Sequence, residues 1–501
     1  MDRAMTAARV FAVALAVGLA AELLLDGHAV GLNVVLAVAV LLTSMATIAG
    51  GVRRLDPMDA WIPVTALVLA GFVALRDDGP LVFVDIVGAL GLCAASAPAL
   101  AGQSVTRRST GAMVDLAARV MTAILTGGLP LLGRVRAESD AGSLAARASR
   151  LAPVARGLLL GAPLLIVFAA LFAAADPIFR HTLDSLFSVD PHFGELPARA
   201  VFTAVATWLV GGLLWFIWVA RPPLVPQSLG AAATEARPVP LFRIGAVEAL
   251  TVLVVLDLLF AVFVALQLAY LFGGLDTLAA IGMTYADYAR RGFFELVAVV
   301  VLVGGLLLGL EAVVAHRSRP YVGGALVLVA LTAVVLASSY LRLALYQEAY
   351  GWTELRFYVL AAIVFLALDL AAAAVLIFRN RSRWLPHAIA ASSLVVLVGV
   401  NLVGPQATIT ERNLERALVP SVVPDYGRRV FDATYLGSLD ADAVPAMVEA
   451  LPALPEAERV RLTVTLRDAH RRFVILDDRT WQATNLSRER ARAALEELFG
   501  P

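Results

Sequence analysis

Long apolar runs alternate with short polar segments along most of this chain. A transmembrane helix needs about 20 mostly apolar residues to cross the ~30 Å hydrocarbon core, because every backbone amide must be hydrogen-bonded within the segment. The pattern predicts eleven such helices, which are Arg9–Leu25, Ala29–Gly50, Ala60–Leu75, Leu81–Ala101, Gly157–Ala175, Val201–Ala220, Ile244–Phe272, Gly292–Val313, Val322–Leu345, Phe357–Phe378 and His387–Gly404.

The pattern changes at Pro405, where hydropathy falls and helical signals with polar faces replace the apolar runs. Candidate helices are 409–418, 442–451 and 456–473, and Ser487 is expected to cap a last helix that ends near Phe499. Trp481 and the aliphatic residues of these helices are expected to form a small core. The predicted fold is therefore all-α: a polytopic transmembrane bundle of about eleven spans with a small helical C-terminal domain.

Three regions follow from this pattern. Residues 1–156 form a four-span region with a cytoplasmic amphipathic segment, and residues 157–404 form a seven-span core with a Pro-rich cytoplasmic loop at 221–240. Residues 405–501 form the soluble domain. The amphipathic segment, Val114–Gly133, carries Asp115 and Arg119, so we expect it to lie on the inner membrane surface instead of crossing.

The arginines indicate the orientation, because basic residues near helix ends are retained in the cytoplasm. With the N-terminus inside, 20 arginines fall in cytoplasmic segments and seven in outer ones. An odd number of spans then places the C-terminal domain outside the cytoplasm.

The composition supports membrane insertion: 60% of residues are hydrophobic and 16% are charged, against roughly 45–50% and 25% in soluble domains. The formal net charge of zero gives no reason to expect a nucleic-acid partner. The single cysteine, Cys93, excludes an intramolecular disulfide and a cysteine-based metal site. Nucleotide-binding, zinc-protease and serine-hydrolase motifs are absent, so we predict no catalytic residue, metal or cofactor, and the sequence favours a non-enzymatic role.

Charged and aromatic residues gather at the predicted outer ends of several spans. Arg291 and Glu295 are four residues apart, which puts them on one helical face. The candidate polar cluster comprises Arg290, Arg291, Glu295, Arg342, Tyr346, Arg356 and Asp85. Anchoring at the membrane surface and a binding site under the C-terminal domain both explain such a cluster.

Two acids lie deeper, Asp257 halfway along one predicted span and Asp369 near the middle of another. A charge at the bilayer centre is costly, so each acid must be protonated, pair with another helix or face water. One hypothesis is a proton or cation relay; the alternative is a neutral Asp bonded to a hydroxyl such as that of Ser338 or Ser339.

Five sequence blocks resemble a bacterial membrane family catalogued as domain of unknown function 4173, with its relative 4153. The blocks are FVALQLAYLFGG (Phe263–Gly274), TYADYARRGFFEL (Thr284–Leu296), RLALYQEAYGWTELR (Arg342–Arg356), YLGSLDADAVPAMVEAL (Tyr435–Leu451) and WQATNLSRERAR (Trp481–Arg492). The resemblance covers roughly Leu158–Pro501. It implies a multi-pass protein of the bacterial cytoplasmic membrane and brings no activity with it.

Three classes of function remain open from the sequence. The first is a sensing, scaffold or envelope-associated module that lies in the lipid bilayer and holds an envelope protein or a small molecule at its outer face. The second is a secondary transporter or channel that uses Asp257 and Asp369. The third is a membrane-embedded transferase, for which the predicted outer loop offers Asp176, Asp184, Asp190 and Glu195.

Overall fold

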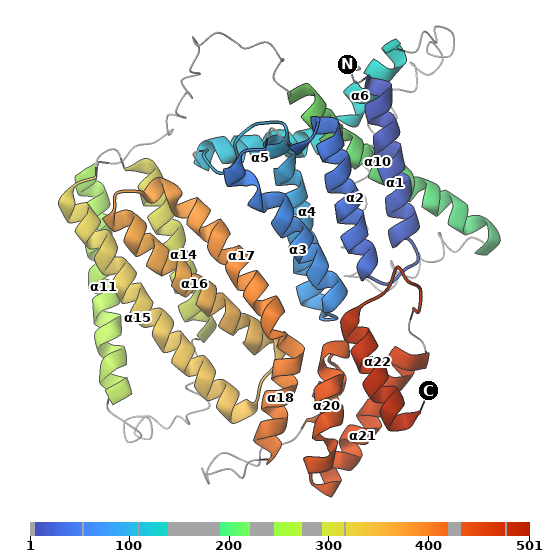
Figure 1. Cartoon of the computed structure of the whole chain (residues 1–501). Coiled ribbons are helices and arrows are strands. Elements are labelled where there is room, and N and C mark those ends of the chain that lie inside the picture. Colours follow the sequence, from blue (N-terminus) through green and yellow to red (C-terminus); the bar gives the residue numbers. More distant parts are fainter. Residues whose placement is uncertain are drawn as a thin grey trace. The chain divides into compact units, whose positions relative to one another are not determined.

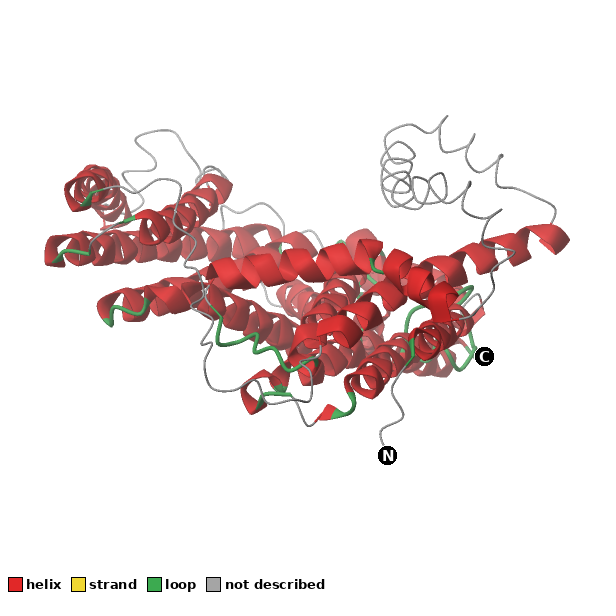
Figure 2. Cartoon of the chain, turned by 90° about the horizontal axis from the view of Figure 1, so that it is seen from above, coloured by secondary structure: helices red, strands yellow, loops and turns green. Residues whose placement is uncertain are grey.

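The computed structural model describes residues 6–52, 55–108, 110–138, 191–220, 245–272, 293–314, 317–418, 432–475 and 478–500. All elements in these ranges are helices, and Figure 2 shows no strand among them. The prediction of an all-α fold is confirmed.

Nine helices in the described ranges are long and apolar enough to cross a membrane, which makes the chain a multi-pass membrane protein by length and composition. They coincide with nine of the eleven predicted spans. The predicted span Gly292–Val313 corresponds to the 21-residue helix α14 (Phe293–Val313), which lies outside those nine. The predicted span Gly157–Ala175 falls outside the described residues.

The chain folds into two compact units. Unit 1 comprises residues 1–75, 82–231 and 478–485; unit 2 comprises residues 76–81, 232–477 and 486–501. The predicted boundaries after residues 156 and 404 came from hydropathy, whereas these units reflect packing, so the predicted domains stay a prediction.

Unit 1 contains α1 (Ala7–Leu25), α2 (Leu32–Ala49), α3 (Trp61–Leu75), α4 (Gly79–Leu100) from residue 82 onward, and α10 (Pro191–Ala220). Helix α1 packs against α2 and α10, and α2 packs against α3. An ion pair between Arg199 and Glu22 joins α10 to the end of α1.

The predicted amphipathic segment of unit 1 is a bent pair, α5 (Thr110–Thr126) and α6 (Gly128–Glu138), with an angle of 53° between its two parts. Helix α5 runs across the direction of α1 to α4 (Figure 1). Gly127 and Gly212 let α5 and α10 approach closely, since a Cβ on Gly212 would lie 2.2 Å from the Ala123 carbonyl oxygen. Whether the pair lies on the membrane surface stays a prediction.

The membrane helices of unit 2 are α11 (Ala246–Phe272), α14, α15 (Arg319–Tyr350), α16 (Glu354–Phe378) and α17 (Leu385–Val403). Helix α15 packs against α11, α14 and α16, and α17 packs against α16. The core between these helices is aliphatic, with Leu328 and Val335 of α15 fully buried.

The tail of unit 2 contains α18 (Pro405–Leu418), α19 (Ala433–Gly437), α20 (Val444–Ala450), α21 (Glu456–His470) and α22 (Leu486–Phe499). Short helical turns at Ala441–Ala443, Leu451–Ala453 and Arg471–Ile475 connect them. Their buried residues form one core, which Phe357 of α16 joins. Figure 1 shows α17 leading into α18 and the tail helices gathered at that end.

Two details of the predicted tail are wrong. Trp481 is 58% exposed and takes no part in the tail core, because residues 478–485 leave the tail and belong to unit 1. Ser487 lies inside the first turn of α22, where its hydroxyl donates to the carboxylate of Asp442 and does not cap the helix.

Candidate functional site

A tight turn joins α15 to α16. Helix α15 ends where Gly351 adopts a positive φ of 83°, a conformation that glycine reaches without steric cost. Thr353 caps α16, its side chain accepting a hydrogen bond from the amide of Arg356. The turn therefore presents Tyr350, Trp352 and Arg356 together.

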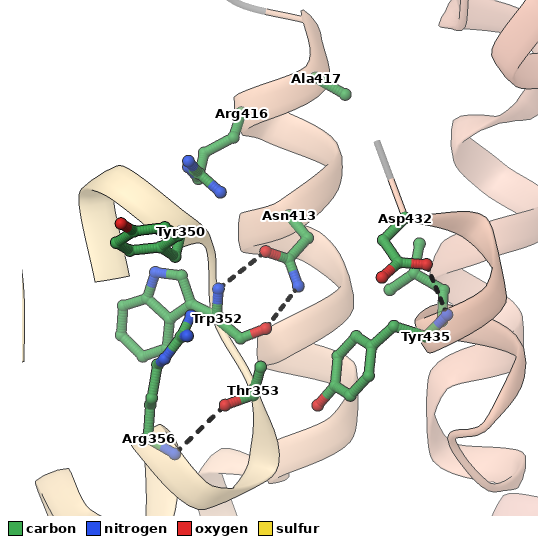
Figure 3. A pocket seen from close by; sticks show the side chains of 10 residues that line it. Tyr350, Trp352, Thr353, Arg356, Asn413, Arg416, Ala417, Asp432 and Tyr435 are labelled. Atoms are coloured by element: carbon green, nitrogen blue, oxygen red, sulfur yellow. Dashed lines mark hydrogen bonds between the residues drawn. The ribbon is translucent and has the colours of Figure 1, made fainter. Parts of the chain in front are cut away.

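Helix α18 of the tail holds this turn through Asn413. The Asn413 side chain accepts from the amide of Trp352 at 2.8 Å and donates to the Trp352 carbonyl at 2.8 Å (Figure 3). One turn later Arg416 donates to the Glu348 carbonyl at 2.6 Å, near the end of α15 where carbonyls lack helical partners. These contacts fix the tail on the turn.

A pocket of about 290 Å³ lies between the turn and the tail. Arg356 and Arg416 supply two guanidinium groups, and Figure 3 shows them on the same side of the pocket as Tyr350. Arg356 stacks on the ring of Tyr346, with 4.0 Å from its guanidinium carbon to the ring centroid. The residues that line the pocket are Tyr350, Trp352, Thr353, Arg356, Asn413, Arg416, Ala417, Asp432, Tyr435 and Leu436.

Two further groups shape the chemistry of this pocket. The carboxylate of Asp432 accepts from the amide of Tyr435 as the cap of α19. The hydroxyl of Tyr435 accepts from the amide of Glu354 at 2.8 Å, which leaves its own proton to be donated. Burial raises the pKa of Tyr435 to about 12, so the hydroxyl stays protonated at neutral pH. The arrangement suits an anionic group beside aromatic rings.

Next to the pocket, five carboxylates from three segments of the chain form what we call the acidic cluster. Asp442 accepts from the amide of Asp77 at 3.1 Å and from the Ser487 hydroxyl at 2.6 Å. Gln406 donates to Glu354 at 2.9 Å and to Asp440 at 3.3 Å. The members of the acidic cluster are Asp77, Asp78, Glu354, Asp440 and Asp442.

Within unit 2, the acidic cluster ties residues 76–78 to the tail. Arg76 lies 3.6 Å from Asp442, and Arg488 of α22 lies 3.6 Å from Asp77. Tyr358 of α16 donates to Asp78 at 2.7 Å. The members of the acidic cluster therefore hold three segments of the chain together.

Burial perturbs two of these carboxylates. It raises the pKa of Asp77 to about 6, against the opposing effect of Arg488, and the neighbouring carboxylates Asp440 and Asp442 raise it further. Burial also raises the pKa of Asp78 to about 6, while its hydrogen bonds from Tyr358 and Leu81 lower it. The Asp78 Oδ2 atom is buried and has no hydrogen-bond partner in the described part of the chain. No described group of His, Cys, Asp and Glu is arranged to hold a metal ion.

The structure brings together two residues of the predicted polar cluster, Tyr346 and Arg356. Arg342 lies on α15 one turn before Tyr346 and is partly buried, and Glu295 is exposed in the first turn of α14. Asp85 is fully buried in α4 and belongs to unit 1. The predicted residues Arg290 and Arg291 lie outside the described residues, as does their expected contact with Glu295.

The two deep acids have different surroundings within unit 2. Asp369 on α16 accepts a hydrogen bond from Ser392 on α17, not from Ser338 or Ser339. Asp257 on α11 faces Gly324 of α15, and its buried Oδ1 has no hydrogen-bond partner among the described residues. The relay remains a hypothesis. The outer-loop acids Asp176, Asp184 and Asp190 lie outside the described residues.

Sequence reasoning missed the residues that complete the pocket and the acidic cluster. Trp352 lies in the block Arg342–Arg356, and Asp440 and Asp442 lie in the block Tyr435–Leu451, so the resemblance pointed at both places. Asn413 and Arg416 lie in the candidate helix 409–418, for which the sequence predicts no binding site. Nothing in their spacing indicated a contact with the α15–α16 turn.

An all-helical, multi-pass membrane protein with a helical tail packed on its span ends is the class that this fold defines. The chain belongs to the family described as Domain of unknown function (DUF4153), which matches residues 64–450. The five sequence blocks pointed to this family as the relative of domain of unknown function 4173. The match begins at residue 64, whereas the resemblance began near Leu158. No curated protein and no solved structure matches the chain significantly.

Proposed function

We propose that this protein is a non-enzymatic sensing module of the bacterial cytoplasmic membrane, which binds a small anionic ligand in the pocket between the α15–α16 turn and the tail. One observation carries the proposal: the pocket walls come from both a membrane-helix turn and tail helices α18 and α19. A ligand in that pocket touches both parts, so its binding energy stabilises the tail on the spans.

The side chains favour an anion with an apolar body. Two guanidinium groups present several donors to a carboxylate or phosphate. Tyr350, Trp352 and Tyr435 offer ring faces and edges, which suit a flat or apolar group. A cation is disfavoured, because the lining has two guanidinium groups, Arg356 and Arg416, and one carboxylate, Asp432.

Binding is tested on the purified full-length protein in detergent. Phenyl phosphate, inorganic phosphate, benzoate and neutral phenol are titrated while thermal unfolding and tryptophan fluorescence are followed. The anions are expected to raise the melting temperature, phenyl phosphate most, and phenol is expected to have no effect. Arg416→Gln should abolish the shift.

Arg412→Gln is the matched control, because Arg412 lies one turn earlier on the same helix and makes an exposed ion pair with Glu415. Equal responses of the Arg416 and Arg412 variants, or no response of the unchanged protein to any anion, would rule out the pocket as the sensing site.

The proposed orientation puts the N-terminus in the cytoplasm and the tail outside, on the strength of the arginine distribution. Reporter fusions at Pro501 and near Ser228 test it. A reporter that is active only outside the cytoplasm should work at Pro501 and stay silent at Ser228; the reverse result overturns the orientation.

Transport is the second candidate, favoured by one observation: the Oδ1 atom of Asp257 is buried on a membrane helix without a hydrogen-bond partner in the described ranges. A carboxylate of this kind suits transient binding of a proton or cation. Proton uptake by reconstituted vesicles, compared between the unchanged protein and Asp257→Asn, is the measurement. Equal uptake by both removes the candidate.

A further inference from the structure

An apolar groove of about 490 Å³ runs along α15 and α16. Six alanines hollow it out, because their short side chains leave space where larger residues would meet. Leu326, Val329, Leu336 and Tyr340 of α15 and Ile363 and Leu370 of α16 complete its walls. The alanines are Ala330, Ala333, Ala337, Ala367, Ala371 and Ala374.

The groove and the pocket share one face of α16. Positions 356, 360, 363, 367, 370 and 374 follow each other at intervals of three or four residues, which places them on one helical stripe. Arg356, which lines the pocket, and Ile363, which lines the groove, therefore lie on the same face of α16, two helical turns apart. Seven residues separate them, a rise of about 10 Å along the helix.

The facing helix adds a polar group on the corresponding stripe. Gln347 lies seven residues beyond Tyr340 on α15, so it continues the stripe that lines the groove. Its side chain is buried, with 5% exposed, and its Nε2 atom has no hydrogen-bond partner among the described residues.

We propose that the groove and the pocket together bind one anionic phospholipid, with an acyl chain along α15 and α16 and the phosphate at Arg356 and Arg416. This rests on the proposed function and names the ligand of the same pocket. Both helices have the length and composition of membrane spans, so an apolar groove along them suits an acyl chain. A soluble anion would use the pocket and leave the groove unused.

Charge complementarity selects the headgroup. Two arginines at the end of an apolar groove match a phosphate at the end of an acyl chain. Arg356 is held in place by the Tyr346 ring and Arg416 by the Glu348 carbonyl, so both cations are positioned before a lipid arrives. The tyrosine and tryptophan at this level suit the headgroup region of a bilayer.

The full-length protein in detergent is mixed with phosphatidylglycerol or phosphatidylcholine, and retained lipid is counted by native mass spectrometry. The unchanged protein is expected to retain phosphatidylglycerol preferentially. Arg416→Gln and Arg356→Gln should each weaken that preference about fivefold, the usual contribution of one basic residue at an anionic lipid surface. Arg412→Gln should leave it unchanged.

The groove is tested separately by filling it. Ala333→Phe and Ala367→Phe place a ring in the groove from either helix, and both should lower retention of phosphatidylglycerol. Val327→Phe is the control, since Val327 is 49% exposed on α15 and does not line the groove. Thermal unfolding of each variant without lipid shows whether it is folded.

The outcomes separate the two proposals. If the arginine variants lose binding of phenyl phosphate but filling the groove changes no lipid retention, the pocket senses a soluble anion, and the lipid inference is wrong while the proposed function stands. Equal retention of both lipids by the unchanged protein also overturns the lipid inference. If neither lipid nor any anion depends on Arg356 or Arg416, both proposals fall.

Discussion

The acidic cluster and the pocket adjoin each other in unit 2, joined by the hydrogen bond from the Glu354 amide to the Tyr435 hydroxyl. In the acidic cluster, backbone amides, a glutamine, a tyrosine and two arginines surround the carboxylates. Asp78 is fully buried, the side chain of Asp442 is 6% exposed, and the other three members are half-buried. In the pocket, aromatic and cationic side chains line open space, and Tyr350 is 53% exposed.

This difference indicates that the two regions have different roles, attachment of the tail for one and ligand binding for the other. Buried charges with many internal partners resist rearrangement, and removing one leaves the others without compensation. Side chains around an open cavity keep donors and ring faces for a ligand. We therefore assign the attachment of the tail to the acidic cluster and ligand binding to the pocket, and the following variants test that assignment.

The largest effect is expected for Asp442→Ala. The side chain of Asp442 is 6% exposed, receives hydrogen bonds from the Asp77 amide and the Ser487 hydroxyl, and lies near Arg76. Loss of one member of such a buried network costs ~3–5 kcal/mol. Limited proteolysis should release the tail much faster than in Glu449→Ala, which changes an exposed acid of α20. Equal cleavage rates would show that the acidic cluster does not hold the tail.

Asp78→Asn tests the electrostatics of the acidic cluster. The pKa of Asp78 in the folded protein, about 6, lies above its ordinary value of 3.8, so the folded state binds the proton more tightly. Its contribution to stability is complete below pH 3.8 and is lost as pH rises through about 6. Asn keeps the acceptor for Tyr358 and carries no charge, so the variant should be ~1–3 kcal/mol more stable at pH 7.5.

The measurement is the melting temperature between pH 4.5 and 7.5. The unchanged protein should lose stability as pH rises, and Asp78→Asn should show a shallower slope. The residual slope belongs to Asp77, whose pKa is also raised to about 6. Parallel slopes for the two proteins would contradict the assignment to Asp78.

Asn413→Ala tests the contact between helix α18 and the α15–α16 turn beside the pocket. Two hydrogen bonds to the Trp352 backbone are lost, and a partly buried amide and carbonyl lose their partners. The expected loss of stability is about 1–3 kcal/mol. Glu411→Ala, on the exposed face of the same helix, is the control. Tryptophan fluorescence should change only in the Asn413 variant; an unchanged spectrum would show that the turn keeps its form without this contact.

The smallest effect on stability is expected for Tyr350→Ala. Its ring is half exposed, so the melting temperature should change by an amount equivalent to about 0.5 kcal/mol or less. Binding of phenyl phosphate should nevertheless weaken, because the ring lines the pocket. A large loss of stability with unchanged binding would contradict this assignment and show that the pocket has a structural role.

The sequence led to parts of both regions and not to the rest. Arg356 and Tyr346 were recognised because charged and aromatic residues at span ends are conspicuous against apolar runs. Asp77 and Asp78 belong to no predicted site, since nothing local distinguishes a loop carboxylate that faces water from one that a distant tail buries. The same holds for Asn413, whose partner Trp352 lies 61 positions away.

The amino-acid sequence by itself determined that this protein is helical, that it has helices able to cross a membrane and where most of them lie. Apolar length and helical periodicity are local properties, and the bilayer imposes the same requirement on each segment separately. Only the tertiary structure decided which polar groups meet. Asp77 and Asp442 are bonded across 365 positions, and such pairings depend on the packing of several helices at once, which no single segment encodes.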